Sequence, residues 1–198
     1  DLASAADATA LQEAAEALRD AANRVAAAAA IAADRAAEAA TGRRLRVLVT
    51  GAGGRIGSDL AARLVDRYDL RLMYHRSVPD DPPVADWLVA DTGAIDSLRP
   101  AVAGMDAVVH LAGEPSTMAP WERVLEANIV GTRNLFEAAR QAGVGRVVFA
   151  STNHVMGMYD RDREWPVYSH QPVRPDSLYG VSKAFGEGKV LGDLFDVM

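Results

Sequence analysis

The chain has 198 residues, a formal net charge of −6 and no cysteine. An acidic balance without a basic stripe disfavours nucleic acid as a partner, and the lack of cysteine excludes disulfides and thiolate metal sites. The apolar run 25–33 is too short to span a bilayer and follows no basic segment, so it is neither a membrane span nor a secretory signal. We expect a cytoplasmic protein without a metal site or membrane association.

The composition divides the chain in two. The first 40 residues contain 21 alanines and neither glycine nor proline. Leu11, Leu18 and Val25 lie seven residues apart with alanines at the other seam positions, a heptad pattern that favours pairing with another helix. A single helix held by alanine propensity alone is the alternative. We predict an Ala-rich helical arm over 1–42 and one α/β domain over 43–198.

A glycine-rich turn is the first motif of the second part. The apolar run 45–49 is followed by TGAGGRIG and then by 58–66, whose apolar residues have helical spacing. In such a strand–turn–helix unit Gly51 permits the turn, Gly54 lets phosphates approach the backbone, and Gly57 lets the helix pack on the strand. The helix N-terminus then offers free N–H groups to a pyrophosphate. An ordinary glycine-rich turn is the alternative.

Apolar strands alternate with helices along the rest of the chain. The predicted strands cover 45–49, 70–74, 87–91, 107–112 and 146–151, and the predicted helices 58–66, 95–102, 121–141 and 179–196. Such alternation gives a parallel sheet with right-handed crossovers. The predicted fold class is α/β, a Rossmann-like doubly wound parallel sheet of about five strands preceded by the helical arm.

Tyr179 and Lys183 can carry acid–base chemistry. They lie at i and i+4 of a predicted helix and therefore share one face. A free phenol ionises near pH ~10, too high for a base at neutral pH, but an adjacent ammonium favours the phenolate. The pair can thus move a proton to or from a carbinol. A solvent-facing helix pair is the alternative, which the preceding glycine turn disfavours.

Six separated motifs resemble those of the extended short-chain dehydrogenases/reductases over about residues 44–190. They are TGAGGRIG, Asp91-Thr92, HLAG from His110, Asn128, STNHVMG from Ser151 and YGVSK from Tyr179. Within this family, the residues after the fifth predicted strand and the stretch RPDSLYG from Arg174 are similar to uronate dehydrogenases and related sugar dehydrogenases.

The resemblance implies an NAD(P)-dependent oxidoreductase that transfers a hydride between a nicotinamide and a sugar or uronate. The implied catalytic residues are Thr152, Tyr179, Lys183 and Asn128. Thr152 and Tyr179 would bind the reacting oxygen and Tyr179 would transfer the proton. Lys183 would hold the cofactor ribose and tune Tyr179, while Asn128 would orient a water or backbone near Lys183.

The resemblance also implies where the substrate lies. Asn153 and His154 follow the fifth strand, at the sheet edge where α/β folds bind ligands, and Ser116 is implied to join them. Asn153 and His154 could both hydrogen-bond sugar hydroxyls or a carboxylate. A structural histidine is the alternative for His154, and we expect His110 to be structural.

The implied cofactor-binding residues are Gly51, Gly54, Arg55, Ile56, Gly57, Arg76, Asp91, Thr92, Leu111, Ala112, Gly113, Tyr179 and Lys183. An NAD enzyme usually ends its second strand with an acid for the ribose hydroxyls. Here that place is Tyr74, followed by His75 and Arg76, and no carboxylate occurs before Asp80. Because a guanidinium suits a 2′-phosphate, Arg76 favours NADP over NAD, helped by Arg55.

One departure from the family affects the expected partners. Members of the family continue with further strands and a substrate lobe, whereas this sequence stops at Met198. The fifth strand is then an open sheet edge, so we expect a homo-oligomer or a partner chain bound through the N-terminal helix and this edge. The alternatives to an oxidoreductase are a sugar epimerase/dehydratase and a catalytically impaired dinucleotide-binding assembly subunit.

Overall fold

The computed structural model describes residues 38–84, 86–168 and 170–194, with side chains to residue 188, and before them the pairs 14–15, 17–18, 21–22, 24–25, 28–29, 32–33 and 35–36. It divides into two compact units, Asp1–Arg44 and Leu45–Met198. In the first unit the described residues up to Thr41 are helical. Leu18 and Val25 are 73% and 70% exposed there, and Leu11 lies outside the described residues.

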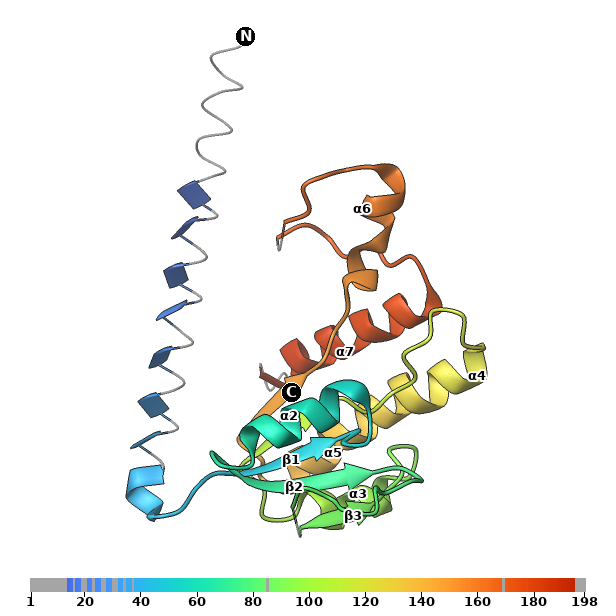
Figure 1. The fold of residues 1–198 in the computed structure, drawn as a ribbon. Coiled ribbons are helices and arrows are strands. Elements are labelled where there is room, and N and C mark those ends of the chain that lie inside the picture. The colour runs from blue at the N-terminus through green and yellow to red at the C-terminus, as the bar shows by residue number, and fades with distance from the viewer. Residues whose placement is uncertain are drawn as a thin grey trace. The chain divides into compact units, whose positions relative to one another are not determined.

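The second unit is built on a five-stranded parallel sheet in the order β3-β2-β1-β4-β5 (Figure 1). The strands are β1 (Arg46–Thr50), β2 (Asp69–Tyr74), β3 (Trp87–Val89), β4 (Ala107–His110) and β5 (Arg146–Phe149). The last residue of β1, Thr50, lies opposite Met73 of β2 and His110 of β4. The chain runs from β1 outward to β3 and then crosses back to place β4 on the other side of β1, which confirms the predicted Rossmann-like fold.

Helical segments connect the strands. They are α2 (Arg55–Leu64), α3 (Ile95–Val102), α4 (Trp121–Val124), the π-helical turn η1 (Leu125–Val130), α5 (Gly131–Gln141), the 3₁₀ turn η2 (Asn153–Met156), α6 (Gly157–Asp162) and α7 (Leu178–Leu194). Within the described ranges, none of these helices has the length and apolar character needed to cross a bilayer.

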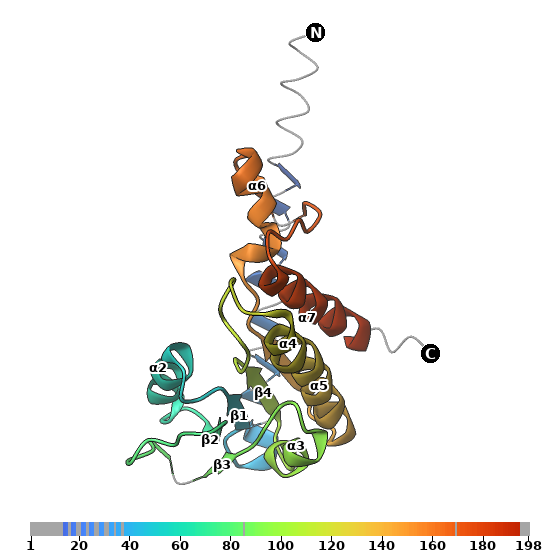
Figure 2. The ribbon, with the colours of Figure 1, turned by 90° about the vertical axis from the view of Figure 1, so that its right-hand side faces the viewer.

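Two hydrophobic cores lie on opposite faces of the sheet. Alternation along β1 sends Leu48 into one core and Val47 and Val49 into the other. The first core includes Leu98 of α3 and Leu135 of α5, and the second includes residues of α2 and β2. Figure 2 shows α2 on one side of the sheet and α3 and α5 on the other. This double cover explains why the strands are apolar nearly throughout.

The element boundaries differ from the sequence prediction at the carboxyl ends of the strands. The predicted strands 87–91, 107–112 and 146–151 end two residues early, at Val89, His110 and Phe149. After β4 the reason is local: the N–H groups of Leu111 and Ala112 donate to Thr50 Oγ1 at 3.2 and 3.1 Å instead of continuing a strand ladder. The turns η2 and α6 were not predicted.

His110 joins three elements beneath this sheet edge. It is completely buried, with Nδ1 2.9 Å from Thr50 Oγ1 and Nε2 3.3 Å from Thr132 Oγ1 of α5. Burial, with a smaller contribution from the charge of Lys183, lowers the pKa of His110 to about 3. The contacts are those expected of the structural role predicted for this histidine.

The buried imidazole predicts acid sensitivity. Between pH ~6.5 and about 3, the unfolded chain protonates His110 and the folded chain does not, so the free energy of unfolding falls as the pH falls. We expect His110→Gln to reduce this slope by up to about 1.4 kcal/mol per pH unit in urea titrations. His75→Gln, at an exposed histidine, is the control, and equal slopes in all three proteins would contradict the assignment.

Candidate active site

The glycine turn between β1 and α2 is shaped by close backbone approaches. Gly51 has φ +67°, and a Cβ there would lie 2.8 Å from the backbone nitrogen of Ala112. A Cβ on Gly57 would lie 2.3 Å from the carbonyl oxygen of Gly51. Gly54 closes the turn by donating its N–H to the same carbonyl at 2.9 Å. Only glycine therefore fits at Gly51 and Gly57.

The turn leaves the N-terminus of α2 without an internal acceptor. Gly54 is the N-cap residue, and no side chain caps the first turn, so its N–H groups remain available. Arg55 and Ile56 in this turn are exposed, and a Cβ on Gly54 would contact only the Gly51 carbonyl. A backbone cradle with free N–H groups and the positive end of the helix dipole fits a pyrophosphate.

The strip 111–113 extends this cradle toward α7. Its first two N–H groups are tied to Thr50, as described for β4. A Cβ on Gly113 would lie 2.8 Å from Asn128 Oδ1 and 4.0 Å from Lys183 Nζ. The same strip therefore contacts the glycine turn at one end and approaches Lys183 at the other. Leu111, Ala112 and Gly113 lie where the sequence expected a cofactor to pass.

At the end of β2, near the expected position of the cofactor ribose, Tyr74 is buried whereas Arg76 is exposed. Tyr74 is buried in the core, where its ring packs edge-on against Trp87, and burial raises the pKa of the phenol. Arg76 is exposed, as is Arg55, and neither guanidinium has an ion pair among the described residues. This edge therefore presents cations, not a carboxylate on β2.

The segment after β3 brings an acid, Asp91, close to His75 at the end of β2. Asp91 is exposed; its Oδ1 accepts from the N–H of Gly93 at 2.8 Å and lies 3.9 Å from His75 Nε2. Thr92 is nearly buried, and its carbonyl accepts from Asn134 Nδ2 of α5 at 3.0 Å. Helix α5 thereby fixes the loop that carries both residues.

Helix α7 presents Tyr179 and Lys183 on one face, as their spacing predicted. Lys183 is only 6% exposed; its Nζ donates to the carbonyl of Ala150 at 2.9 Å and lies 5.8 Å from the centre of the Tyr179 ring. Burial lowers the pKa of Lys183. The ammonium is therefore anchored at the end of β5, beside Tyr179 and the ring of Phe149.

Two glycines bring α7 against the end of β5. A Cβ on Gly180 would lie 2.4 Å from the carbonyl oxygen of His154, and one on Gly186 would lie 2.3 Å from the ring of Phe149. Both contacts are shorter than any real Cβ contact, so the helix can approach this closely only without side chains at these positions.

Asn128 fixes the floor of the site from the π-helical turn η1. Its Oδ1 accepts from the N–H of Glu114 at 2.7 Å, while Nδ2 donates to the Glu114 carbonyl at 3.0 Å and to Ser182 Oγ at 2.9 Å. Ser182 in turn donates to the carbonyl of Tyr179 at 2.7 Å. Asn128 thus orders backbone next to Lys183, one of the two roles expected for it, and Ser182 is a partner that the sequence analysis did not identify.

The residues after β5 form the other wall. Thr152 is half-buried; its hydroxyl accepts from the N–H of His154 at 3.3 Å and donates to Asn153 Oδ1 at 3.4 Å. Asn153 is exposed, and the His154 ring packs edge-on against Tyr179 with centroids 5.9 Å apart. Thr152, His154 and Tyr179 are therefore brought together.

Ser116 lies on a different segment, the loop after β4. It is exposed; its N–H donates to Glu114 Oε1 at 3.0 Å, and its hydroxyl accepts from the N–H of Met118 at 3.1 Å. No contact joins Ser116 to Thr152 or Tyr179 among the described residues. In the same ranges, no group of three His, Asp or Glu side chains could hold a metal ion.

Asp176 is the principal site residue missed by sequence reasoning. Both carboxylate oxygens lie 3.0 Å from His154 Nδ1, although the two residues are 22 positions apart. The only signal was its place in the RPDSLYG stretch, which assigned it no role.

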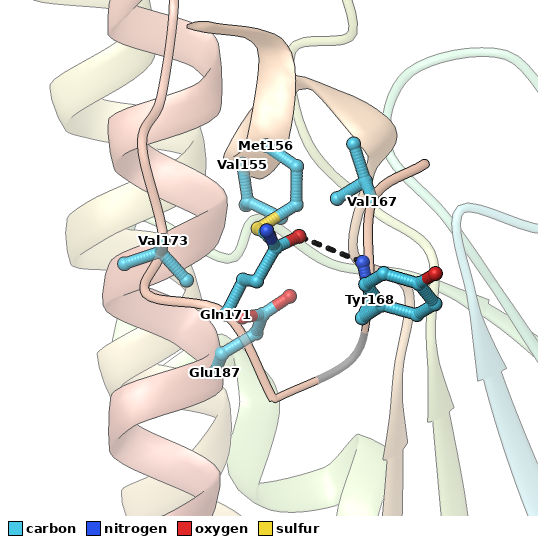
Figure 3. Close-up of a pocket in the computed structure, with 7 residues that line it drawn as sticks. All are labelled: Val155, Met156, Val167, Tyr168, Gln171, Val173 and Glu187. Carbon is cyan, nitrogen blue, oxygen red and sulfur yellow. Dashed lines mark hydrogen bonds between the residues drawn. The ribbon is translucent and has the colours of Figure 1, made fainter. Parts of the chain in front are cut away.

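A pocket of about 320 Å³ lies beside this wall (Figure 3). Its lining residues are Val155, Met156, Val167, Tyr168, Gln171, Val173 and Glu187. The amide oxygen of Gln171 accepts from the N–H of Tyr168 at 2.7 Å, which shapes the loop after α6. Glu187 also accepts a hydrogen bond from Ser151 Oγ. None of the four expected catalytic residues lines this pocket.

The fold, the glycine turn and the Tyr–Lys helix together define a dinucleotide-binding short-chain dehydrogenase/reductase architecture. The chain matches the NAD dependent epimerase/dehydratase family over residues 47–191 and belongs to that family. The resemblance found in the sequence is therefore confirmed.

Two relatives of the chain are dehydrogenases of a sugar phosphate and of uronates. The chain is 40% identical over 168 residues to the NAD-dependent glucose-6-phosphate dehydrogenase of Haloferax volcanii, covering 76% of this chain and 64% of that protein. It is 43% identical over 144 residues to the uronate dehydrogenase of Agrobacterium fabrum, covering 72% and 53%. The chain thus spans between half and two thirds of these relatives' length.

A solved structure shows the same fold with a cofactor. A mutant uronate dehydrogenase from Agrobacterium tumefaciens complexed with NAD is 37% identical and has a TM-score of 0.62, covering 76% of this chain and 57% of that chain.

Proposed function

We propose that this chain carries the cofactor half and the proton-transfer residues of an NAD(P)-dependent dehydrogenase that acts on a sugar or uronate. The observation that carries the proposal is the strip 111–113, which contacts the glycine turn at Gly51 and approaches Lys183 through Gly113. A dinucleotide with its pyrophosphate at the turn would extend along this strip toward Tyr179.

The chain's own residues support acid–base work at this place. Lys183 is held in place by the Ala150 carbonyl, and its Nζ lies 5.8 Å from the centre of the Tyr179 ring. The Thr152 hydroxyl accepts from the N–H of His154 and donates to Asn153 Oδ1 at 3.4 Å, a long bond that a substrate oxygen could replace. When bound, the nicotinamide supplies hydride transfer, and Tyr179 accepts the hydroxyl proton.

The first test measures turnover and cofactor binding separately. With glucuronate and glucose 6-phosphate as substrates, we expect Tyr179→Phe to lower kcat by about 100-fold or more, because the proton acceptor is lost. Cofactor affinity in calorimetry should be unchanged in this variant. Gly54→Asp should abolish cofactor binding, since its carboxylate would repel the pyrophosphate.

Gly188→Asp is the matched control, because a Cβ there meets nothing within 4 Å. Equal cofactor affinity of Gly54→Asp and wild type would refute the cradle. Full turnover by Tyr179→Phe would refute the proton-transfer role.

We also propose a preference for NADP over NAD. The support is the exposed guanidinium of Arg76, two residues after β2, together with Arg55, which is exposed in the glycine turn. Tyr74, at the end of β2, is turned into the core and is not an acid, and the carboxylate of Asp91 lies 3.9 Å from His75. A planar guanidinium binds phosphate oxygens in bidentate fashion.

Arg76→Ala should weaken NADP binding by about tenfold or more through the loss of a charge-assisted contact, and should leave NAD binding unchanged. Arg63→Ala, which removes an exposed charge paired with Asp59 on α2, is the control. Titration of both cofactors decides the matter: if wild type binds NAD as tightly as NADP, the preference does not exist.

We further propose that the chain self-associates through its N-terminal helix. Leu18 and Val25 are exposed large apolar residues at heptad spacing, and β5 forms a sheet edge on which Val148 is 51% exposed. Both features disfavour an isolated chain.

Light scattering should therefore give wild type at least twice the mass of one chain. Leu18→Glu combined with Val25→Glu should lower that mass, because charges at the seam repel. Ala26→Glu with Ala33→Glu adds the same charge outside the seam and should not. A monomeric wild-type protein would overturn the proposal.

A further inference from the structure

Asp176 was given no role by the sequence analysis, yet both its backbone and its side chain are held by hydrogen bonds. It lies in the segment before α7, and its N–H donates to the carbonyl of His154 at 3.3 Å. Both of its oxygens lie 3.0 Å from His154 Nδ1, and Oδ1 also accepts from Ser177 Oγ at 2.9 Å. Ser177 Oγ is itself held by the N–H of Gly180 at 3.1 Å.

Two glycines make room for this pair. A Cβ on Gly157 would lie 2.2 Å from an Asp176 oxygen, and a Cβ on Gly180 would lie 2.4 Å from the His154 carbonyl. A side chain at either position would push the carboxylate or the imidazole out of place. The backbone on both sides therefore accommodates one arrangement of Asp176 and His154.

The charge state of Asp176 decides which atom carries the proton between Asp176 and His154. Burial raises the pKa of Asp176, but the hydrogen bonds from His154 and Ser177 outweigh it, so the net pKa is lowered and the carboxylate is ionised. An ionised carboxylate only accepts hydrogen bonds. The proton between the two groups therefore resides on Nδ1 of His154.

The other ring nitrogen is then defined as well. In a neutral imidazole with Nδ1 protonated, Nε2 carries a lone pair and accepts a hydrogen bond. Among the described residues, no hydrogen bond engages His154 Nε2. The ring packs edge-on against Tyr179, on the wall that the proposed substrate contacts.

We propose that Asp176 is a positioning residue, which holds His154 as the Nδ1–H tautomer so that Nε2 accepts a hydrogen bond from a sugar hydroxyl beside Tyr179. The hydroxyl as partner rests on the proposed function; the tautomer does not. While its ring is neutral, His154 in this tautomer has no N–H at Nε2 to offer a substrate carboxylate and accepts a hydrogen bond from a hydroxyl.

The tautomer can be measured on the whole chain without substrate. Long-range ¹H–¹⁵N spectra distinguish a ring nitrogen that bears a proton from one that does not. The chain has four histidines, and the His154 signals are those that vanish in His154→Gln. At a pH where the ring is neutral, we expect a protonated Nδ1 and a bare Nε2. A protonated Nε2 in wild type would overturn the proposal.

Asp176→Asn keeps the size of the side chain but offers an amide donor to Nδ1. We expect protonation to move toward Nε2, and KM for glucuronate to rise about tenfold with kcat nearly unchanged, because the lost hydrogen bond serves bound substrate and transition state alike. Cofactor affinity should not change. Asp160→Asn, which removes an exposed acid of α6, is the control.

A double-variant cycle separates positioning from a general structural effect. In the His154→Gln background, Asp176→Asn should raise KM less than twofold further, since Asp176 acts through His154. A full tenfold effect in both backgrounds would overturn the proposal. If the chain turns over no sugar, the proposed function fails, and the ¹H–¹⁵N spectra still decide whether Asp176 holds the tautomer.

Discussion

The approach of α7 to the segment that follows β5 is the constraint on which the candidate site depends. Side chains are excluded at Gly180 and Gly186, so the helix axis lies close to the backbone of His154 and the ring of Phe149. That spacing lets Lys183 reach the Ala150 carbonyl instead of solvent. A helix pushed outward by a side chain at either glycine would carry the backbone of Tyr179 and Lys183 away from the end of β5.

The site is assembled from both halves of the sheet. The glycine turn belongs to the β1–α2 connection, whereas the proton-transfer residues belong to β5 and α7. The strip after β4 lies between them, tied to Thr50 on one side and to Asn128 through the neighbouring Glu114 on the other. β1 and β4 are the strands between which strand order reverses in this doubly wound sheet. Buried polar contacts of His110 tie the end of β4 to the end of β1 and to α5.

Local chemistry explains what could be predicted from sequence. The glycine spacing, the apolar strands and the i, i+4 relation of Tyr179 and Lys183 each depend on neighbours within one or two turns of chain. The pairing of His154 with Asp176 depends instead on the intervening segment, which Arg174 folds back through ion pairs with Asp162 and Glu164. No periodicity encodes such a contact.

The π-helical turn η1 could not be predicted from the sequence either. Its single extra residue leaves the apolar stripe of 121–141 recognisable, so the sequence predicts one helix. The wider turn nevertheless includes Asn128, whose three hydrogen bonds bring together Glu114 and Ser182 from distant parts of the chain. The end of β4 was overestimated because its apolar residues continue after the strand ladder has been replaced by bonds to the Thr50 side chain.

The glycines around His154 also restrict how this scaffold could acquire a different substrate. Gly157 and Gly180 face the carboxylate and the backbone of the pair at distances that exclude any larger residue, so neither position is open to adaptive change. Asn153, by contrast, is exposed, and its side chain can be exchanged without moving backbone. Proteins that share this wall but prefer different sugars should therefore differ in sequence at exposed polar positions. Gly157 and Gly180 should be the same in all of them.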